Sequence, residues 1–301
     1  MTSEQKKLRE GFFLAISAYM IWGGITPIYF NALSNISSLE LLSHRIIWSF
    51  LLLIPVVHFS SHWDSVFNTI KSIKTIGYLV LTATLISSNW LIFILAISTN
   101  RMLDASLGYY INPLFNVLLG LIFLKERLRK MQWLAVFLVV CGVLVQCITF
   151  GSIPVISILL AMTFGIYGLL RKKINLDVNT GLFIEVMIML PIAIGYLFFI
   201  TESQTSNLMR NSTSLNFLLI TSGIITILPM LCFIGSARKL KLSTLSFFQY
   251  IAPSLIFLLA VLKYDEIFSI DKIITFSLIW VAMIIFAFDG MNPTSKNNHN
   301  L

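Results

Sequence analysis

Apolar runs long enough to cross a membrane recur along this whole chain, and they constrain its fold more than any other feature. A helix of about 20 apolar residues spans the ~30 Å hydrocarbon core of a bilayer. Backbone groups in lipid must be satisfied internally and no alternating barrel pattern is present, so each run predicts a helix. The expected fold is an all-α polytopic membrane protein with ten transmembrane helices. The ten runs lie at residues 11–33, 39–59, 76–97, 103–124, 131–149, 153–170, 181–200, 214–236, 243–262 and 270–289.

The composition and the charge pattern support the same class. The chain is 57% hydrophobic and 11% charged, whereas a soluble domain holds about 25% charged residues. If the N-terminus is cytoplasmic, sixteen of the 21 lysines and arginines fall inside, four fall outside, and Arg45 stays in the membrane. This positive-inside bias predicts an even number of spans with both termini cytoplasmic. The net charge of +8 therefore reflects topology, and the expected partner is a lipid bilayer rather than nucleic acid.

The sequence carries no signature of a metal site, a cofactor or an enzyme. Cys141, Cys147 and Cys232 all lie within predicted spans, and no CxxC spacing occurs. Neither a Walker motif nor HExxH is present. Ser43 and His44 are adjacent on one predicted helix, where they cannot readily form a nucleophile–base pair. We therefore expect no metal, no cofactor and no catalysis.

Two segments of the chain resemble each other at an offset of 140 residues. SLGYYINPLFNVLLGLIFLKE (106–126) and SFFQYIAPSLIFLLAVLKYDE (246–266) are identical at seven of 21 positions. Leucine and isoleucine matches are common in membrane helices, but a shared Tyr-Ile-x-Pro and a shared terminal Glu are not. The informative pairs are Tyr110 with Tyr250, Pro113 with Pro253, and Glu126 with Glu266.

This match predicts an internal repeat of five helices. Because five is odd, the second unit (151–290) is inverted relative to the first (1–150), and 291–301 is expected to be a disordered cytoplasmic tail. Inverted repeats are typical of secondary transporters, whose sites lie near the midplane beside interrupted helices. Pro113 and Pro253 mark such interruptions, although simple kinks tolerated by neighbouring helices are the alternative.

Arg45 and Glu185 are the two charged residues that lie well inside predicted spans, and they too are 140 residues apart. A charge at the centre of a span costs roughly 2.5–3.5 kcal/mol, and such residues are usually functional. The inverted symmetry puts them at two depths of one cavity, with a direct ion pair as the alternative. Arg45 could instead snorkel to the headgroups. Glu185 could be a structural hydrogen-bond partner or a proton-coupling carboxylate.

Aromatic and amide side chains cluster near the glycines and prolines that interrupt the predicted helices. Such a set suits flat or partly apolar metabolites, and ordinary packing is the alternative for each member. His44 either forms an interhelical hydrogen bond or relays a proton. The predicted substrate-binding residues are Tyr19, Trp22, His44, Arg45, Asn89, Trp90, Tyr110, Asn112, Tyr167, Glu185, Gln249 and Tyr250, with Pro113 and Pro253 as helix-interrupting residues.

Several of these motifs occur together in one known family. SAYMIWGGITPIYF, LELLSHRIIWS, SSNWLIFILAIS, DASLGYYINPLFNVLLGLIFLKERL, GIYGLLRKK and LSFFQYIAPSLIFLLAVL resemble the RarD branch of the EamA-type permeases, in the drug/metabolite transporter superfamily. The resemblance runs from about Gly11 to Asp289. It implies ten helices in two inverted five-helix repeats, a bacterial inner-membrane location, and export or exchange of small organic molecules. The branch takes its name from a suspected link to chloramphenicol.

The function expected from these features is secondary active transport of a small-molecule substrate by alternating access at the repeat interface. Coupling to protons or to a counter-substrate is open, and the sequence predicts no oligomeric state. If Arg45 holds the substrate, the substrate should carry a carboxylate, a phosphate or another acceptor group. The alternatives are a non-transporting structural or regulatory membrane protein and a channel.

Overall fold

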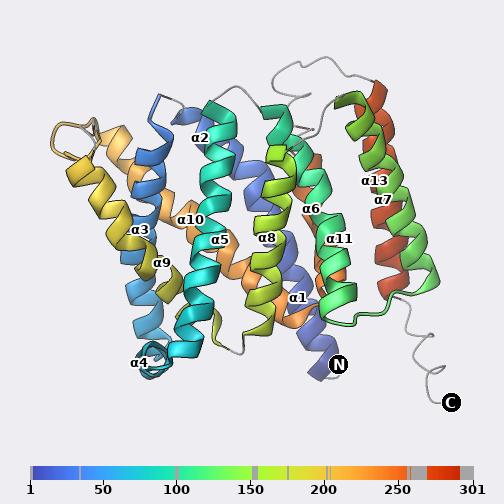
Figure 1. The fold of residues 1–301 in the computed structure, drawn as a ribbon, viewed down its shortest axis with the longest axis horizontal. Helices are drawn as coiled ribbons and strands as arrows, with labels where there is room; N and C mark the ends of the chain where they lie inside the picture. Colours follow the sequence, from blue (N-terminus) through green and yellow to red (C-terminus); the bar gives the residue numbers. More distant parts are fainter. Residues whose placement is uncertain are drawn as a thin grey trace.

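The computed structural model describes residues 3–33, 35–98, 102–150, 155–174, 176–200, 203, 205–255, 258 and 270–291. Throughout these residues the secondary structure is helical, and no strand occurs among them. The long helices run side by side, and the N-terminus and the short helix α4 lie at the same end of the molecule (Figure 1). The elements are α1 (Ser3–Met20), η1 (Ile21–Ile25), α2 (Thr26–Ala32), α3 (Ser38–Phe59), α4 (Trp63–Lys71), α5 (Ile73–Ser98), α6 (Met102–Phe123), α7 (Lys130–Phe150), α8 (Val155–Lys173), α9 (Val178–Gly195), η2 (Tyr196–Ile200), α10 (Thr213–Lys239), α11 (Leu242–Gln249) and α13 (Ile270–Met291).

Seven of the described helical stretches are long and apolar enough to cross a membrane, and two shorter apolar helices lie at Gly108–Phe123 and Ile273–Phe286. Large apolar side chains stay exposed along these helices, among them Phe137, Ile192 and Phe217. Exposed apolar surface of this extent needs an apolar solvent around it. The chain is therefore a multi-pass helical membrane protein, as the apolar runs predict. The count of ten helices in an inverted repeat stays a prediction.

The first predicted span is a helix with a π-helical segment in its middle. The backbone changes from α to π between Ile21 and Ile25, where Gly23 and Gly24 remove side-chain bulk. A Cβ atom at Gly23 would lie 2.6 Å from the Cα of Ala252. Glycine is therefore required where this helix crosses the end of α11. Single π turns in α-helices often occur at functional sites.

The two predicted helix interruptions behave differently. α6 continues through Pro113 from Met102 to Phe123, so the expected interruption is not seen there. α11 ends at Gln249, and Tyr250 adopts a turn before helical geometry resumes. Pro253 has no amide hydrogen to donate to the carbonyl of Gln249, which accounts for the helix changing at this point.

The core is divided between two groups of helices. α3 packs against α9 and α10, α1 against α10, and α8 against α5 and α6. The pair α7 and α13 lies to one side of this group (Figure 1). A separate cluster of buried residues joins that pair to α6 and α11, with Tyr110 and Tyr250 among its members.

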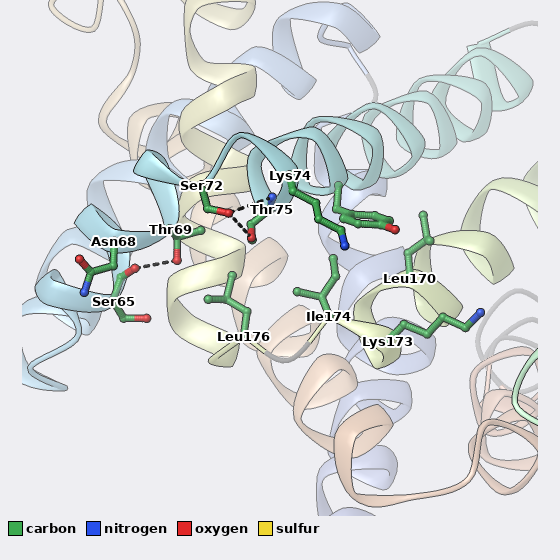
Figure 2. Close-up of a pocket in the computed structure, with 11 residues that line it drawn as sticks. Ser65, Asn68, Thr69, Ser72, Lys74, Thr75, Leu170, Lys173, Ile174 and Leu176 are labelled. Carbon is green, nitrogen blue, oxygen red and sulfur yellow. Dashed lines mark hydrogen bonds between the residues drawn. The ribbon is translucent and has the colours of Figure 1, made fainter.

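A cavity of 830 Å³ opens where α4, the start of α5 and the end of α8 meet (Figure 2). Polar side chains of α4 and α5 line one wall, and residues at the end of α8 line the other. None of the twelve predicted substrate-binding residues lines this cavity. It is therefore distinct from the candidate site described below.

Candidate functional site

Five aromatic rings from three helical stretches form one cluster in the larger core. Trp22 lies in the π segment, with its ring 5.5 Å from that of Tyr19 and 5.9 Å from those of both Phe164 and Phe233. Tyr167 joins the cluster through Phe233, at 6.5 Å between ring centroids. The structure thus brings together three predicted residues, Tyr19, Trp22 and Tyr167. Phe164 and Phe233 were not predicted, since nothing distinguishes them among the 24 phenylalanines of the chain.

Two polar groups beside this cluster are buried without hydrogen-bond partners among the described residues. They are the hydroxyl of Tyr19, a residue 3% exposed, and both side-chain amide atoms of Gln249, a residue 5% exposed. The two side chains are close enough to interact, but neither makes a hydrogen bond of good geometry among the described residues. A buried polar group without a partner costs about 1–3 kcal/mol. This pair therefore offers donors and acceptors to a bound molecule.

Arg45 is buried in α3 and has a different set of neighbours. Its Nε donates to Oγ1 of Thr226 on α10 at 2.8 Å. Its guanidinium carbon lies 4.9 Å from the centre of the Trp90 ring and 5.1 Å from that of Phe30. No carboxylate among the described residues forms an ion pair with it. Arg45 and the predicted Trp90 are thus in contact, and the cation is held by aromatic faces and a hydroxyl rather than by an anion.

Glu185 has its own partners, and Arg45 is not one of them. Thr82 donates to Oε1 at 2.6 Å, and the Tyr167 hydroxyl donates to Oε2 at 3.2 Å. Nε of Arg171 lies 3.6 Å from Oε1, and both side chains are almost fully buried. The alternative of a direct Arg45–Glu185 pair is therefore not realised. The structural role that the sequence left open for Glu185 agrees with these contacts.

Arg171 is a site residue that the sequence analysis did not single out. It begins the basic run Arg171-Lys172-Lys173 at the end of α8. Its side chain is instead directed into the protein and is 1% exposed. Gly181 on α9 leaves the space for it, since a Cβ there would lie 2.1 Å from Nη1 of Arg171. In the sequence, the only indication of this contact is Gly181, which lies one helical turn before Glu185 and leaves room for a large side chain.

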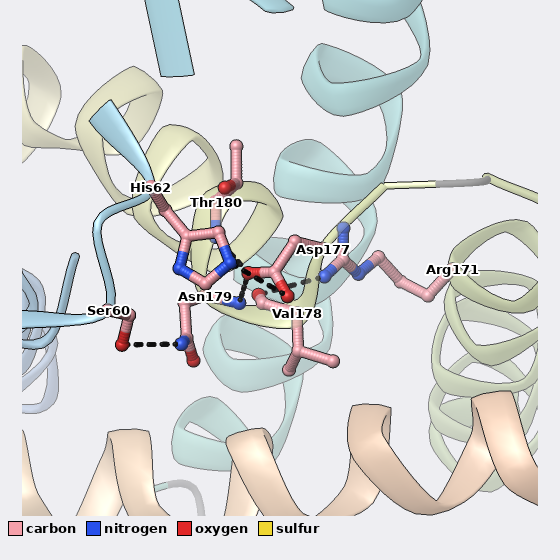
Figure 3. A network of polar contacts seen from close by, with 7 residues as sticks. All are labelled: Ser60, His62, Arg171, Asp177, Val178, Asn179 and Thr180. Carbon is pink, nitrogen blue, oxygen red and sulfur yellow. Dashed lines mark hydrogen bonds and ion pairs between the residues drawn. The ribbon is translucent and has the colours of Figure 1, made fainter. Parts of the chain in front are cut away.

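A polar network joins this buried pair to the surface (Figure 3). Nη2 of Arg171 donates to the carbonyl of Val178, at 3.4 Å. The preceding Asp177 caps α9 by accepting bonds from the backbone amides of residues 179 and 180. The same carboxylate lies 3.6 Å from Nε2 of His62, which precedes α4. The network therefore fixes the start of α9 against the connection between α3 and α4.

His44 and Asn89 have structural partners instead of facing Arg45. Nε2 of His44 lies 2.9 Å from Oγ1 of Thr205, which donates in turn to Glu40 at 2.9 Å. Asn89 donates from Nδ2 to the carbonyl of Leu160, at 2.9 Å, and to a hydroxyl of the next turn of α8. Asn89 thus joins α5 to α8, whereas His44 joins α3 to the connection between η2 and α10, so its role is structural but its partner is not on another helix.

Tyr110, Asn112 and Tyr250 lie outside the aromatic cluster. The hydroxyl of Tyr250 donates to the backbone carbonyl of Tyr110, at 3.0 Å, and both tyrosines pack toward α7 and α13. Asn112 accepts a bond from Asn116 at 3.4 Å. The structure therefore separates the predicted residues into a central cluster, an Arg45 group and this tyrosine pair.

Glu126, the last residue of the first matched segment, joins α6 to α11. Its carboxylate accepts bonds from the backbone amides of Leu242 at 2.7 Å and Ser243 at 3.0 Å, and from the Ser243 hydroxyl at 2.6 Å. Lys172 of α8 donates nearby to the carbonyls of Ala237 and Leu240. These contacts close one end of the bundle between α6, α8, α10 and α11.

Replacing Glu126 by alanine should therefore destabilise the folded protein by about 1–3 kcal/mol, because three donors at the start of α11 lose a charged acceptor. Thermal unfolding of the detergent-purified protein measures this. Arg127→Ala, at an exposed neighbouring position, is the control. If the two variants unfold at the same temperature, Glu126 does not hold α11.

Comparisons with known proteins agree with the helical membrane architecture. The model of the EamA-like transporter family matches residues 9–147. An uncharacterized transporter of Vibrio cholerae is 55% identical over 291 residues, with 97% of this chain and 96% of the relative covered. The protein RarD of Escherichia coli K12 is 50% identical over 288 residues, with 96% and 97% covered. A chloramphenicol-sensitive protein RarD of Pseudomonas aeruginosa is 28% identical, with 95% and 96% covered.

A solved crystal structure shares the fold. It superimposes with a TM-score of 0.73 at 15% sequence identity, covering 95% of this chain and 99% of the other. The family model, the near full-length relatives and the apolar helices all indicate the same kind of protein. The chain belongs to the EamA-like transporter family, in its RarD group, and is a membrane transporter of the drug/metabolite transporter type.

Proposed function

We propose that this protein is a secondary active transporter that exports or exchanges small organic metabolites or drugs. Two inverted five-helix repeats, residues 1–150 and 151–290, alternate access to a site between them. The protein lies in the bacterial inner membrane with both termini cytoplasmic, which the distribution of its lysines and arginines supports. Coupling uses protons or a counter-substrate.

Contacts between the two halves of the chain support the repeat. Tyr110 and Tyr250, 140 residues apart, are joined by a hydrogen bond. Gly23 packs against the backbone of Ala252 beside α11, and Gly165 packs closely against Phe115 on α6. Each glycine thus abuts the segment of the other half that carries Pro113 or Pro253. A pseudo-twofold axis between α6 and α11 would produce this pattern.

The observation that carries the proposal is the buried amide of Gln249 beside the Tyr19 hydroxyl, which makes no hydrogen bond of good geometry within the described part of the chain. An aromatic cluster with two free polar groups matches a molecule that has a flat apolar part and hydrogen-bonding groups. Chloramphenicol has this chemistry, with an aromatic ring, an amide and hydroxyl groups. A relative named as chloramphenicol-sensitive makes such compounds the first to test.

The test is counterflow of radiolabelled chloramphenicol, followed by a panel of aromatic and acidic metabolites, into proteoliposomes. We expect saturable uptake that requires unlabelled compound on the opposite side. Gln249→Leu should lower the apparent affinity by roughly fivefold to 150-fold, because a buried partner costs about 1–3 kcal/mol to lose. Gln5→Leu, at an exposed position of α1, is the matched control.

Three results would contradict parts of this proposal. Flux that never saturates and shows no counterflow would indicate a channel. A well-folded protein that moves no compound of the panel would favour the non-transporting structural or regulatory alternative. Equal affinity of wild type and Gln249→Leu would remove Gln249 from the site and leave transport standing.

A further inference from the structure

The 830 Å³ cavity between α4, α5 and α8 has a composition that selects for one kind of ligand. Its eleven lining side chains include two lysines and no aspartate or glutamate. Lys74 comes from the first turn of α5 and Lys173 is the last residue of α8, so the two lysines of the lining belong to separate elements (Figure 2). The cavity is therefore a cationic site built by the fold rather than by one run of basic residues.

Neither lysine forms an ion pair within the part of the chain that the structure describes. No carboxylate among the described residues lies within ion-pair distance of either ammonium group. The Nζ atom of Lys173 instead lies 5.3 Å from the centre of the Phe123 ring, a contact that keeps the full positive charge. Both cations are thus available to an anion from outside the chain.

The wall opposite α8 supplies neutral hydrogen-bonding groups. Ser65, Asn68, Thr69, Ser72 and Thr75 all face the cavity. The hydroxyls of Ser72 and Thr75 lie 2.9 Å apart, and that of Thr69 donates to the carbonyl of Ser65 at 2.6 Å. The Thr69 hydrogen is thus already donated, while the two lysines, the Asn68 amide and the remaining hydroxyls, without a carboxylate, form a donor set that suits a phosphate ester.

Helix α4 places the cavity at the boundary of the membrane. Phe67 and Ile70 on the other side of α4 are 58% and 42% exposed, and Ile73 just beyond it is 89% exposed. A short helix with exposed apolar residues on one face and polar residues on the other lies in the plane of the membrane interface. In Figure 1, α4 lies at the ends of α3 and α5. The cavity is then at headgroup depth, with apolar Leu170 and Ile174 at its edge.

We propose that this cavity binds the phosphate-bearing headgroup of an anionic membrane phospholipid. Lys74 and Lys173 pair with the phosphate, the hydroxyl wall binds the polar part of the headgroup, and the acyl chains lie along the apolar surface of α4. The site is separate from the aromatic cluster, so it can be tested without knowledge of the transported substrate. A soluble phosphate ester has the same chemistry, and the experiment separates the two sources.

The test is native mass spectrometry of the detergent-purified protein titrated with phosphatidylglycerol or with zwitterionic phosphatidylethanolamine. We expect phosphatidylglycerol to be retained selectively. Each lysine near an anionic lipid contributes about fivefold in affinity, so Lys74→Gln/Lys173→Gln should weaken binding roughly 25-fold. Lys6→Gln/Lys7→Gln removes the same charge from exposed positions of α1 at the same end of the molecule and should change little. Lys74→Arg/Lys173→Arg should retain binding.

Competition identifies the source of the phosphate. If millimolar inorganic phosphate or glycerol phosphate leaves the lipid adduct intact, a lipid is the occupant. If either displaces it, the phosphate site stands but the lipid assignment is overturned. Equal phosphatidylglycerol binding by wild type and Lys74→Gln/Lys173→Gln, or equal loss in the Lys6→Gln/Lys7→Gln control, would overturn the site itself.

Discussion

Arg171→Leu should destabilise the folded protein by about 3–5 kcal/mol, because it leaves the Glu185 carboxylate buried without its cation. Glu185 is 0% exposed and would keep only the hydroxyls of Thr82 and Tyr167 as partners. The bond from Arg171 to the start of α9 would be lost as well. Thermal unfolding in detergent and the yield of folded protein in the membrane both measure the effect.

The double variant tests whether the loss comes from the unpaired charge. Arg171→Leu/Glu185→Leu removes both ions and should recover most of the stability, since replacing a buried pair by apolar residues is often neutral or stabilising. Arg129→Leu is the matched control. Its partner is Asp289 at 3.5 Å, but Arg129 is 38% exposed, and such surface pairs contribute about 0–1 kcal/mol. Equal effects of Arg171→Leu and Arg129→Leu would contradict a structural role for the buried pair.

The helical architecture could be predicted from the sequence because lipid restricts which secondary structures the backbone can adopt. An apolar run of about 20 residues has to form a helix in a bilayer, and the long described helices fall where the runs predict them. The π segment at Ile21–Ile25 was not predicted, although Gly23 and Gly24 mark it. Hydrophobicity indicates that a segment lies in the membrane. It does not indicate where the backbone hydrogen bonds change from the α-helical to the π-helical pattern.

The candidate site could be predicted only in part from the sequence, because the spacing of residues along the chain does not say which helices are neighbours. Tyr19, Trp22 and Tyr167 were chosen as an aromatic set and do lie together. Arg45 and Glu185 were linked by their offset of 140, yet each has other partners in space. Inverted symmetry relates positions on opposite sides of the midplane, so equivalent residues need not touch. The true partner of Glu185 was hidden in a run of basic residues at a helix end.

Arg45→Met should behave in the opposite way to Arg171→Leu: stability is kept and transport of acidic compounds is lost. Arg45 leaves no anion behind among the described residues, and its partner Thr226 still donates to the carbonyl of Ser222 at 2.7 Å. Removing the cation also removes the cost of burying it. We expect the unfolding free energy to stay within about 1 kcal/mol of wild type.

Transport should respond far more strongly than stability. A charge-assisted bond to a substrate contributes about 1.5–3 kcal/mol, so counterflow of a carboxylate- or phosphate-bearing compound should fall roughly tenfold to 150-fold in Arg45→Met. Arg45→Lys keeps the charge but cannot offer the planar fork of donors, so it should recover only part of the activity. Neutral substrates of the same size should be affected little.

The comparison of the two arginines separates a structural cation from a functional one. Both are buried near the end of a membrane helix, but Arg171 is paired and Arg45 is held by aromatic rings and a hydroxyl. If Arg45→Met unfolds as easily as Arg171→Leu, Arg45 is structural too, and the acidic-substrate prediction fails with it. If Arg45→Met is stable and transports acidic compounds normally, the cation is not part of the site. Only retained stability with lost transport of anions agrees with a guanidinium kept unpaired for the substrate.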